Sequence, residues 1–258
     1  MRFPPRRLVC LTEETVETLY WMQEQDRIVG VTGYAVRPPQ VRKEKPRVSA
    51  FTSANTGKIL ALKPDLVLAF SDLQADIAAE LGRAGAAVHL FNQRDVAGIF
   101  AMIEMLGALI GEPAKGVALA NDLRRRVDAV AASVPTGSRP RVYFEEWDDP
   151  LITGIGWVSE LIEIAGGVDC FAYLRGRQGA KDRIIASDDV IAAKPDVIVA
   201  SWCGKKVAKA KIAGRPGWDA IPAVANKRIV EIKSPLILQP GPAALTDGLD
   251  ALMAAIHG

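Results

Sequence analysis

Histidines, cysteines and long apolar runs are scarce in this 258-residue sequence, and each scarcity excludes a class of protein. With only His89 and His257, the chain lacks the imidazoles from which most zinc and copper sites are built. The three cysteines, Cys10, Cys170 and Cys203, are too few and odd in number for a disulfide framework. Because no apolar run reaches the ~18 residues of a membrane-spanning helix, we expect no membrane insertion.

An excess of charge of one sign is also missing. The 32 Lys and Arg residues against 30 Asp and Glu leave a net charge of +2, so we expect no nucleic-acid partner, which usually requires a strongly basic face. Behind the basic first residues, the apolar run Leu8–Leu11 is too short for a secretory leader. The sequence as it stands therefore predicts a cytoplasmic protein, or a periplasmic one if a leader was removed or the start is misassigned.

The composition, 49% apolar and 24% charged, is that of a folded protein. Short runs rich in Val, Ile and Leu alternate with helical patterns, which is typical of buried parallel strands in an α/β protein. These predicted strands are Leu8–Leu11, Ile28–Val31, Leu66–Phe70, Val88–Phe91, Val142–Phe144, Val197–Ala200 and Ile229–Ile232. Helices are predicted between them over residues 12–22, 72–84 and 95–109.

A short repeat indicates that the chain has two related halves. Residues 61–69 read ALKPDLVLA, and residues 192–200 read AAKPDVIVA, so that Lys63 and Lys194 are 131 positions apart. In each copy a helix should end before the proline, and an apolar strand follows. We therefore expect two Rossmann-like α/β lobes, although a chance match of two Pro-Asp turns is the alternative.

One long helix is predicted between the two copies. The segment Pro113–Ser133 has no internal proline and places Leu119, Leu123, Val127 and Val130 in one stripe, which gives a helix about 30 Å long. The predicted organisation is an N-terminal lobe over 1–112, a connecting helix over 113–135 and a C-terminal lobe over 136–258. An ordinary crossover helix within one continuous sheet is the alternative.

This arrangement resembles the helical-backbone, class III substrate-binding proteins that serve ABC importers of cobalamin, ferric siderophores, haem and some metals. The segments Arg7–Glu17, Asp26–Thr32 and Asn55–Asp65 are similar, in this order, to that family's opening strand and helix, second strand, and first helix–strand unit. The cobalamin-binding branch is nearest. The resemblance implies a ligand cleft between the lobes, a small-molecule ligand such as a corrinoid and an ABC permease as partner. We also expect no cofactor, no bound metal and a monomer.

The resemblance also points to the surface that would dock on a permease. Seven positions before the KPD proline of each lobe, family members typically carry an acidic residue that pairs with permease arginines. This chain has Gly57 and Asp188 at those positions. Asp188 is therefore the predicted transporter-docking residue, whereas the other docking carboxylate is missing at Gly57.

Candidate ligand contacts follow the strands, because ligands of open α/β sheets bind outside the carboxyl ends of the strands. Tyr34 and Phe51 stand where the resemblance implies ring-stacking aromatics. Flat aromatic faces with a few polar anchors suit a large, rigid metal chelate, although each residue would alternatively pack within its own lobe or face solvent. The predicted ligand-binding set is Tyr34, Phe51, Ser71, Glu145, Glu146, Trp147 and Trp202.

These observations predict a non-catalytic protein that binds a corrinoid or a related metal chelate. A ferric-siderophore-binding protein is one alternative. Another is a cytoplasmic enzyme that processes tetrapyrroles or corrinoids, like a chelatase, with Glu145, Glu146 and Cys203 as acid, base and metal-transfer groups. The absence of a G-x-x-x-x-G-K-[ST] motif and of a G-x-G-x-x-G turn after a strand disfavours NTPase and dinucleotide chemistry.

Overall fold

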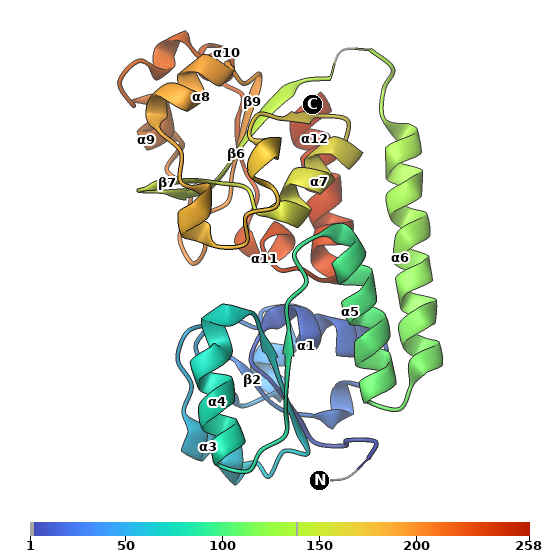
Figure 1. The fold of residues 1–258 in the computed structure, drawn as a ribbon. Helices are drawn as coiled ribbons and strands as arrows, with labels where there is room; N and C mark the ends of the chain where they lie inside the picture. The colour runs from blue at the N-terminus through green and yellow to red at the C-terminus, as the bar shows by residue number, and fades with distance from the viewer. Residues whose placement is uncertain (1–2, 138) are drawn as a thin grey trace. The chain divides into compact units, whose positions relative to one another are not determined.

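The computed structural model describes residues 3–137 and 139–258, and the chain divides into two compact units. The N-lobe comprises the residues up to 93 and 97–124, and the C-lobe comprises 94–96 and 125–258. Both are α/β, so the predicted two-lobed α/β architecture is confirmed (Figure 1). Helix α6 (Pro113–Ser133) has the predicted bounds, and its residues are shared between the two units. A separate connecting segment at 113–135 therefore stays a prediction.

The N-lobe contains a five-stranded, all-parallel sheet in the order β3-β2-β1-β4-β5. Its strands are β1 (Leu8–Cys10), β2 (Ile28–Thr32), β3 (Arg47–Ser49), β4 (Leu66–Phe70) and β5 (Val88–Phe91). Because all five run the same way, their carboxyl ends share one edge of the sheet. The strand order changes direction between β1 and β4, so the residues after these two strands lie at the switch point of the sheet.

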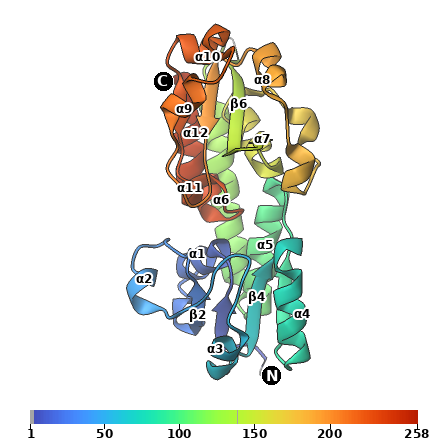
Figure 2. The same ribbon diagram turned by 90° about the vertical axis from the view of Figure 1, so that its left-hand side faces the viewer.

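Helices cover both faces of the N-lobe sheet. They are α1 (Glu13–Trp21), α2 (Val41–Glu44), α3 (Thr56–Ala61), α4 (Ala75–Arg83) and α5 (Val96–Leu109), with 3-10 turns η1 (Gln25–Arg27) and η2 (Asp72–Gln74). Side chains of α3 and α4 pack on Val9 and Val67 in one core cluster (Figures 1 and 2). Leu8 and Leu68, which point to the opposite face, are also completely buried. Burial on both faces explains why these strands are almost wholly apolar.

The C-lobe sheet has the order β10-β9-β6-β7, with β8 beside the first residues of β6. Its strands are β6 (Arg141–Asp148), β7 (Leu151–Thr153), β8 (Val168–Asp169), β9 (Val197–Ala200) and β10 (Ile229–Glu231). Strands β6, β9 and β10 are parallel, whereas β7 runs back antiparallel along β6. Residues 145–148 therefore lie in β6, which continues beyond the predicted strand Val142–Phe144 because pairing with β7 extends it.

The C-lobe helices are α7 (Gly156–Ile164), α8 (Ser187–Ala193), α9 (Lys209–Ala213), α10 (Pro222–Ala225), α11 (Ser234–Ile237) and α12 (Leu249–His257), with shorter turns η3 (Ala172–Leu174), η4 (Ala180–Arg183), η5 (Trp218–Ala220) and the π-helical η6 (Ala244–Gly248). The core includes Tyr143, whose ring lies edge-on to Phe171 and Trp218 at centroid distances of 5.7 and 6.1 Å. Among the described helices, none combines the length and apolarity needed to cross a bilayer.

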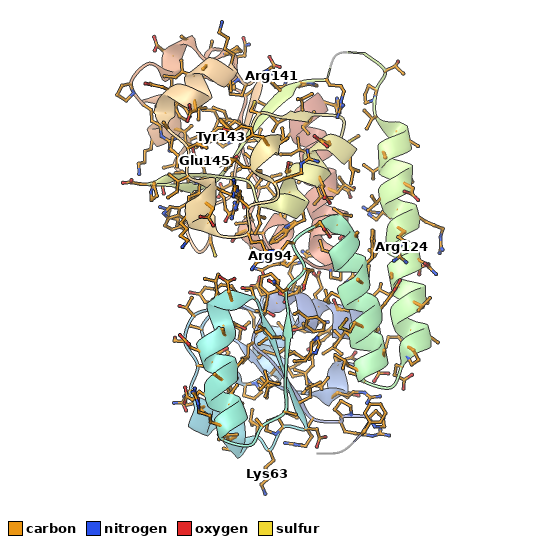
Figure 3. The ribbon with its side chains drawn as sticks, in the orientation of Figure 1. Lys63, Arg94, Arg124, Arg141, Tyr143 and Glu145 are labelled. Atoms are coloured by element: carbon orange, nitrogen blue, oxygen red, sulfur yellow. The ribbon has the colours of Figure 1, made fainter. Side chains whose placement is uncertain are left out.

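The two copies of the KPD repeat have the same backbone conformation. Lys63 and Lys194, each the residue before the proline, have positive φ angles of 48° and 47°. A left-handed residue ends the preceding helix and turns the chain towards the strand. Figure 3 shows Lys63 at this turn, with its side chain directed away from the N-lobe.

The aspartate of each repeat makes the same contact in both lobes. Asp65 Oδ2 accepts a hydrogen bond from Arg7 N at 3.1 Å, and Asp196 Oδ2 accepts one from Arg141 N at 2.8 Å. Each arginine then donates from Nε to the carbonyl at the end of the helix before the repeat's turn. The repeat therefore locks the first strand of each lobe to the strand beside it, and the prediction of two related lobes is confirmed.

Candidate functional site

The carboxyl-end edge of the N-lobe sheet is held together by one buried side chain, Gln74. Its Nε2 donates hydrogen bonds to Leu11 O at 3.1 Å and to Phe51 O at 2.8 Å, while its Oε1 accepts one from Phe70 N at 3.0 Å. Leu11 follows β1, Phe51 follows β3, and Phe70 is the last residue of β4. The side chain is completely buried. It therefore fixes three strand ends relative to one another, and no sequence pattern had singled it out.

The structure brings two predicted aromatic residues to this edge. Tyr34 follows β2 and is 47% exposed, and Phe51 follows β3 and is half-buried. Their strands are neighbours, and Gly33 N, next to Tyr34, donates to Ser49 O at 2.7 Å. The N-lobe thus presents aromatic side chains at adjacent strand ends, as the sequence predicted, and their contact with a ligand stays a prediction.

Ser71, the third candidate in this lobe, has a structural role at the end of β4. It follows β4 with a positive φ of 64°, and its side chain is completely buried. Its Oγ accepts a hydrogen bond from Leu73 N at 3.3 Å, and its own N donates to Phe91 O at 2.7 Å. Ser71 therefore turns the chain from β4 into η2, and its contact with a ligand stays a prediction.

Buried carboxylates also lie at the switch point, directly after β1. Glu13 and Glu14 are 7% and 1% exposed, Glu14 Oε1 accepts a hydrogen bond from Thr12 Oγ1 at 2.5 Å, and Glu17 pairs with Arg37 at 2.9 Å. Burial and the neighbouring Glu14 and Glu17 raise the pKa of Glu13 to about 8, although Arg37 opposes this. Burial likewise raises the pKa of Glu14 to about 7, against the hydrogen bond from Thr12.

The raised pKa values of Glu13 and Glu14 predict a pH-dependent stability. Between about pH 4.5 and 8 these two carboxyls bind more protons in the folded chain than in the unfolded chain, so their contribution to the free energy of unfolding should fall as the pH rises through this window. Denaturant unfolding from pH 4.5 to 8 should show a flatter profile for Glu13→Gln/Glu14→Gln than for the natural chain. The exposed Glu80→Gln serves as control, and equal slopes in all three proteins would contradict the prediction.

In the C-lobe, Glu145 is at the centre of a buried ion pair. Its side chain is completely buried in β6, where Arg215 contributes Nη1 at 2.5 Å from Oε2 and Nη2 at 3.0 Å from Oε1. Trp202 Nε1 donates to Oε1 at 3.1 Å, and the Tyr143 hydroxyl donates to Oε2 at 3.2 Å. Figure 3 labels Tyr143 and Glu145 along this strand. These partners enclose both oxygens of Glu145, and its contact with a ligand stays a prediction.

The neighbouring carboxylates of β6 are also paired. Both oxygens of Glu146 accept hydrogen bonds from Arg183, at 2.6 and 3.1 Å. Asp148 pairs with Lys205 at 2.5 Å and Lys211 at 2.6 Å. Although burial opposes ionisation of Asp148, the hydrogen bonds from both lysines keep its pKa below the ordinary value. The crowding of acidic residues that the sequence shows is thus compensated by basic residues from distant segments.

The ammonium group of Lys205 contacts the rings of both Trp147 and Trp202. Its Nζ lies 4.0 Å from the centroid of the Trp147 ring and 4.8 Å from that of Trp202, within the range of cation–π contacts. Trp147 is half-buried and donates from Nε1 to Asp149 O at 3.0 Å, whereas Trp202 is only 3% exposed. Trp147 therefore keeps an accessible surface, and Trp202 acts mainly as a packed wall.

A pocket of about 540 Å³ opens at the carboxyl ends of β9 and β10. This is the edge of the C-lobe sheet at which the general rule for α/β proteins places ligands. Its lining residues are Trp202, Gly204, Lys205, Lys206, Glu231, Ile232, Lys233, Ser234 and Pro235. The sequence pattern had pointed to the loop after β9 but not to Lys233, which follows β10. Three lysines against one carboxylate make the pocket basic.

The geometry does not support the enzymatic alternative. Glu145 is enclosed by Arg215, and Glu146 is held by Arg183, so neither is placed to exchange a proton with a substrate. Within residues 3–137 and 139–258, no group of three or more His, Cys, Asp or Glu side chains is arranged to hold a metal ion. Cys203 is exposed on the loop after β9.

The two positions of the predicted docking surface are both exposed. Asp188 lies in the first turn of α8, and Gly57 lies in α3. Among the described residues, a Cβ atom at Gly57 would come within 4 Å of Asn55 Oδ1 alone, at 3.5 Å. Packing therefore does not require a glycine where the resemblance implies an acidic residue.

Comparison with known proteins agrees with this fold and with a binding function. The chain is 27% identical to an uncharacterized ABC transporter substrate-binding lipoprotein of Bacillus subtilis (strain 168), over 98% of this chain and 80% of that protein. It is 26% identical to the periplasmic vitamin B12 binding protein of Vibrio cholerae, covering 99% of this chain and 98% of that one, with a TM-score of 0.78. A periplasmic heme-binding protein in complex with two hemes is also 26% identical, with coverages of 97% and 98% and a TM-score of 0.77. The model of the family described as periplasmic binding protein matches residues 8–236, so the chain belongs to that family.

Proposed function

We propose that this chain is a substrate-binding protein whose ligand is a tetrapyrrole-type metal chelate, with a corrinoid as the first candidate. The observation that carries the proposal is the presence of Tyr34 and Phe51 at adjacent strand ends of one edge. The names of two similar structures, which bind vitamin B12 and heme, support the same ligand class. Catalysis has no part in the proposal, because the carboxylates of β6 are committed to ion pairs.

The aromatic pair suits a flat, rigid ligand for two reasons. Tyr34 leaves nearly half of its surface uncovered, so a macrocycle would bury apolar ring area that now faces solvent. Phe51 is held through its carbonyl by Gln74, so its backbone position is set before any ligand arrives. A preorganised contact loses less conformational entropy on binding. In the C-lobe, Trp147 is the third aromatic residue that we include.

The direct test is equilibrium dialysis against hydroxocobalamin, followed by its visible absorbance. The natural chain should retain the ligand with micromolar affinity or better, and Tyr34→Ala should weaken binding about tenfold, since an aromatic contact contributes roughly 1 kcal/mol or more. Tyr173→Ala is the matched control, because Tyr173 is 73% exposed in the C-lobe turn η3. The proposal fails if hydroxocobalamin and haemin are both lost on dialysis, and retention of a ferric siderophore alone would favour the siderophore alternative.

A permease partner belongs to the same proposal. The first relative named above is an ABC transporter substrate-binding lipoprotein, and the two similar structures are periplasmic proteins. We extend this setting to the present chain as a periplasmic location, with Asp188 on α8 as the docking carboxylate. Because Gly57 lacks a second one, docking should depend more strongly on Asp188 than it does where both acidic residues are present.

A further inference from the structure

The basic pocket at the carboxyl ends of β9 and β10 contains one lysine whose ammonium group already has partners within the protein. Lys205 pairs with Asp148 at 2.5 Å and lies over the rings of Trp147 and Trp202. Asp148 also pairs with Lys211, so this carboxylate is already shared between two ammonium groups. Lys205 therefore acts as part of the pocket wall and has little capacity left for a ligand.

The other two lysines of the pocket, Lys206 and Lys233, have ammonium groups that face solvent. Lys206 and Lys233 are exposed, and in the part of the chain that the structure describes, neither ammonium group has a hydrogen bond or an ion pair. The single carboxylate of the lining, Glu231, accepts a hydrogen bond from Val207 N at 3.1 Å. Lys206 and Lys233 lie on separate loops, after β9 and after β10. They are thus two cationic groups on the lining of one concavity.

The balance of charge around the pocket favours an anion. Four lysines contribute, Lys205, Lys206, Lys211 and Lys233, against the two carboxylates of Asp148 and Glu231. Trp202, Ile232 and Pro235 add apolar surface to the lining. A ligand group that fits such a pocket combines an apolar body with an acidic end, since ammonium groups form their strongest hydrogen bonds with oxyanions.

We propose that Lys206 and Lys233 bind an oxyanion carried by the ligand, and that this pocket therefore selects chelates with acidic side groups over neutral ones. The inference rests on the proposed function, because it takes the ligand to be a tetrapyrrole-type chelate. Two sources supply this chemistry, the carboxylates on the rim of a macrocycle or the phosphodiester of a corrinoid's nucleotide loop. Both would place a negative charge between the two lysines.

Two matched pairs of ligands show whether the oxyanion is a macrocycle carboxylate or a corrinoid phosphodiester. Cyanocobalamin carries the phosphodiester and dicyanocobinamide lacks it, while mesohaemin carries two carboxylates that its dimethyl ester lacks. Affinities are measured by absorbance titration for the natural chain and for Lys206→Gln/Lys233→Gln. In one of the two pairs, we expect Lys206→Gln/Lys233→Gln to lower the affinity for the acidic ligand about tenfold relative to the natural chain. The affinity for the neutral ligand of the same pair should change less than twofold. The difference should shrink at high salt, because exposed charges are screened.

The control variant is Lys181→Gln/Lys209→Gln, which removes the same charge from exposed C-lobe positions outside the pocket lining. It should leave all four affinities unchanged. The proposal is overturned if the pocket variant and this control have the same affinities, or if the pocket variant weakens binding of neutral and acidic ligands equally. In either case, retention of any tetrapyrrole would leave the proposed function standing. If the natural chain binds none of the four ligands, the proposed function falls and this inference falls with it.

Discussion

Arg215→Ala is expected to destabilise the C-lobe by about 3–5 kcal/mol, because it leaves a buried carboxylate without its cation. Glu145 is completely buried, and the Arg215 guanidinium, with a side-chain exposure of 13%, donates to both of its oxygens. Once the arginine is lost, the hydrogen bonds from Trp202 and Tyr143 remain but supply no full positive charge. Urea unfolding followed by tryptophan fluorescence would measure the loss.

Two further variants show that the effect comes from the uncompensated charge. Glu145→Gln/Arg215→Met removes both charges and keeps an acceptor for Trp202, so it should recover most of the stability lost in Arg215→Ala. Arg177→Ala, which shortens an exposed arginine of the same lobe, should change the free energy of unfolding little. A loss below about 1 kcal/mol in Arg215→Ala would mean that the pair behaves like a solvent-screened surface pair.

The same ion pair connects stability to the proposed site. Trp202 forms part of the pocket wall, and its indole is oriented by Glu145. The Lys205 ammonium group contacts the rings of Trp202 and Trp147 and forms an ion pair with Asp148. Glu145 therefore orients Trp202 in the pocket wall, and its own contact with a ligand stays a prediction.

The strands and the long helix could be predicted because their signals are local. A buried parallel strand is a continuous apolar run, and the segment that forms α6 shows its apolar stripe over 21 residues. Among the strands of two or three residues, β1 and β10 lie within predicted apolar runs, whereas β3, β7 and β8 lie outside the predicted runs and were missed. Such short strands carry no periodicity of their own, and their pairing with longer neighbours defines them.

The roles of individual side chains were harder to predict, because their partners are distant in sequence. Arg183 is 37 positions from Glu146, and Arg215 is 70 positions from Glu145, so the local sequence around these two glutamates does not show their partners. Tyr34 and Phe51 were assigned because the resemblance implies aromatic residues at these positions, and the structure places both after neighbouring strands at one edge. Lys233 was missed because its significance depends on the loop after β9 that faces the same pocket.

Gln74→Leu is expected to lower the stability of the N-lobe by about 3 kcal/mol. The substitution keeps an apolar side chain of similar size but removes three hydrogen bonds, and each buried partner left unsatisfied costs about 1 kcal/mol or more. Gln40→Leu is the matched control, since Gln40 is exposed in the same lobe. Thermal unfolding of both variants should show a large loss only for Gln74, and equal losses would contradict the role assigned to it.

Gln74→Glu separates the positioning role of this side chain from its contribution to stability. A carboxylate can still accept the hydrogen bond from Phe70 N, but it has no N–H for the carbonyls of Leu11 and Phe51. The loop that carries Phe51 should therefore lose its anchor, and hydroxocobalamin affinity should fall about tenfold at temperatures where the variant is still folded. Hydrogen exchange should rise at the amides around residue 51 and stay unchanged in the C-lobe core around Tyr143. Unchanged affinity in a folded Gln74→Glu protein would show that the edge positions Phe51 without Gln74, or that Phe51 does not contact the ligand.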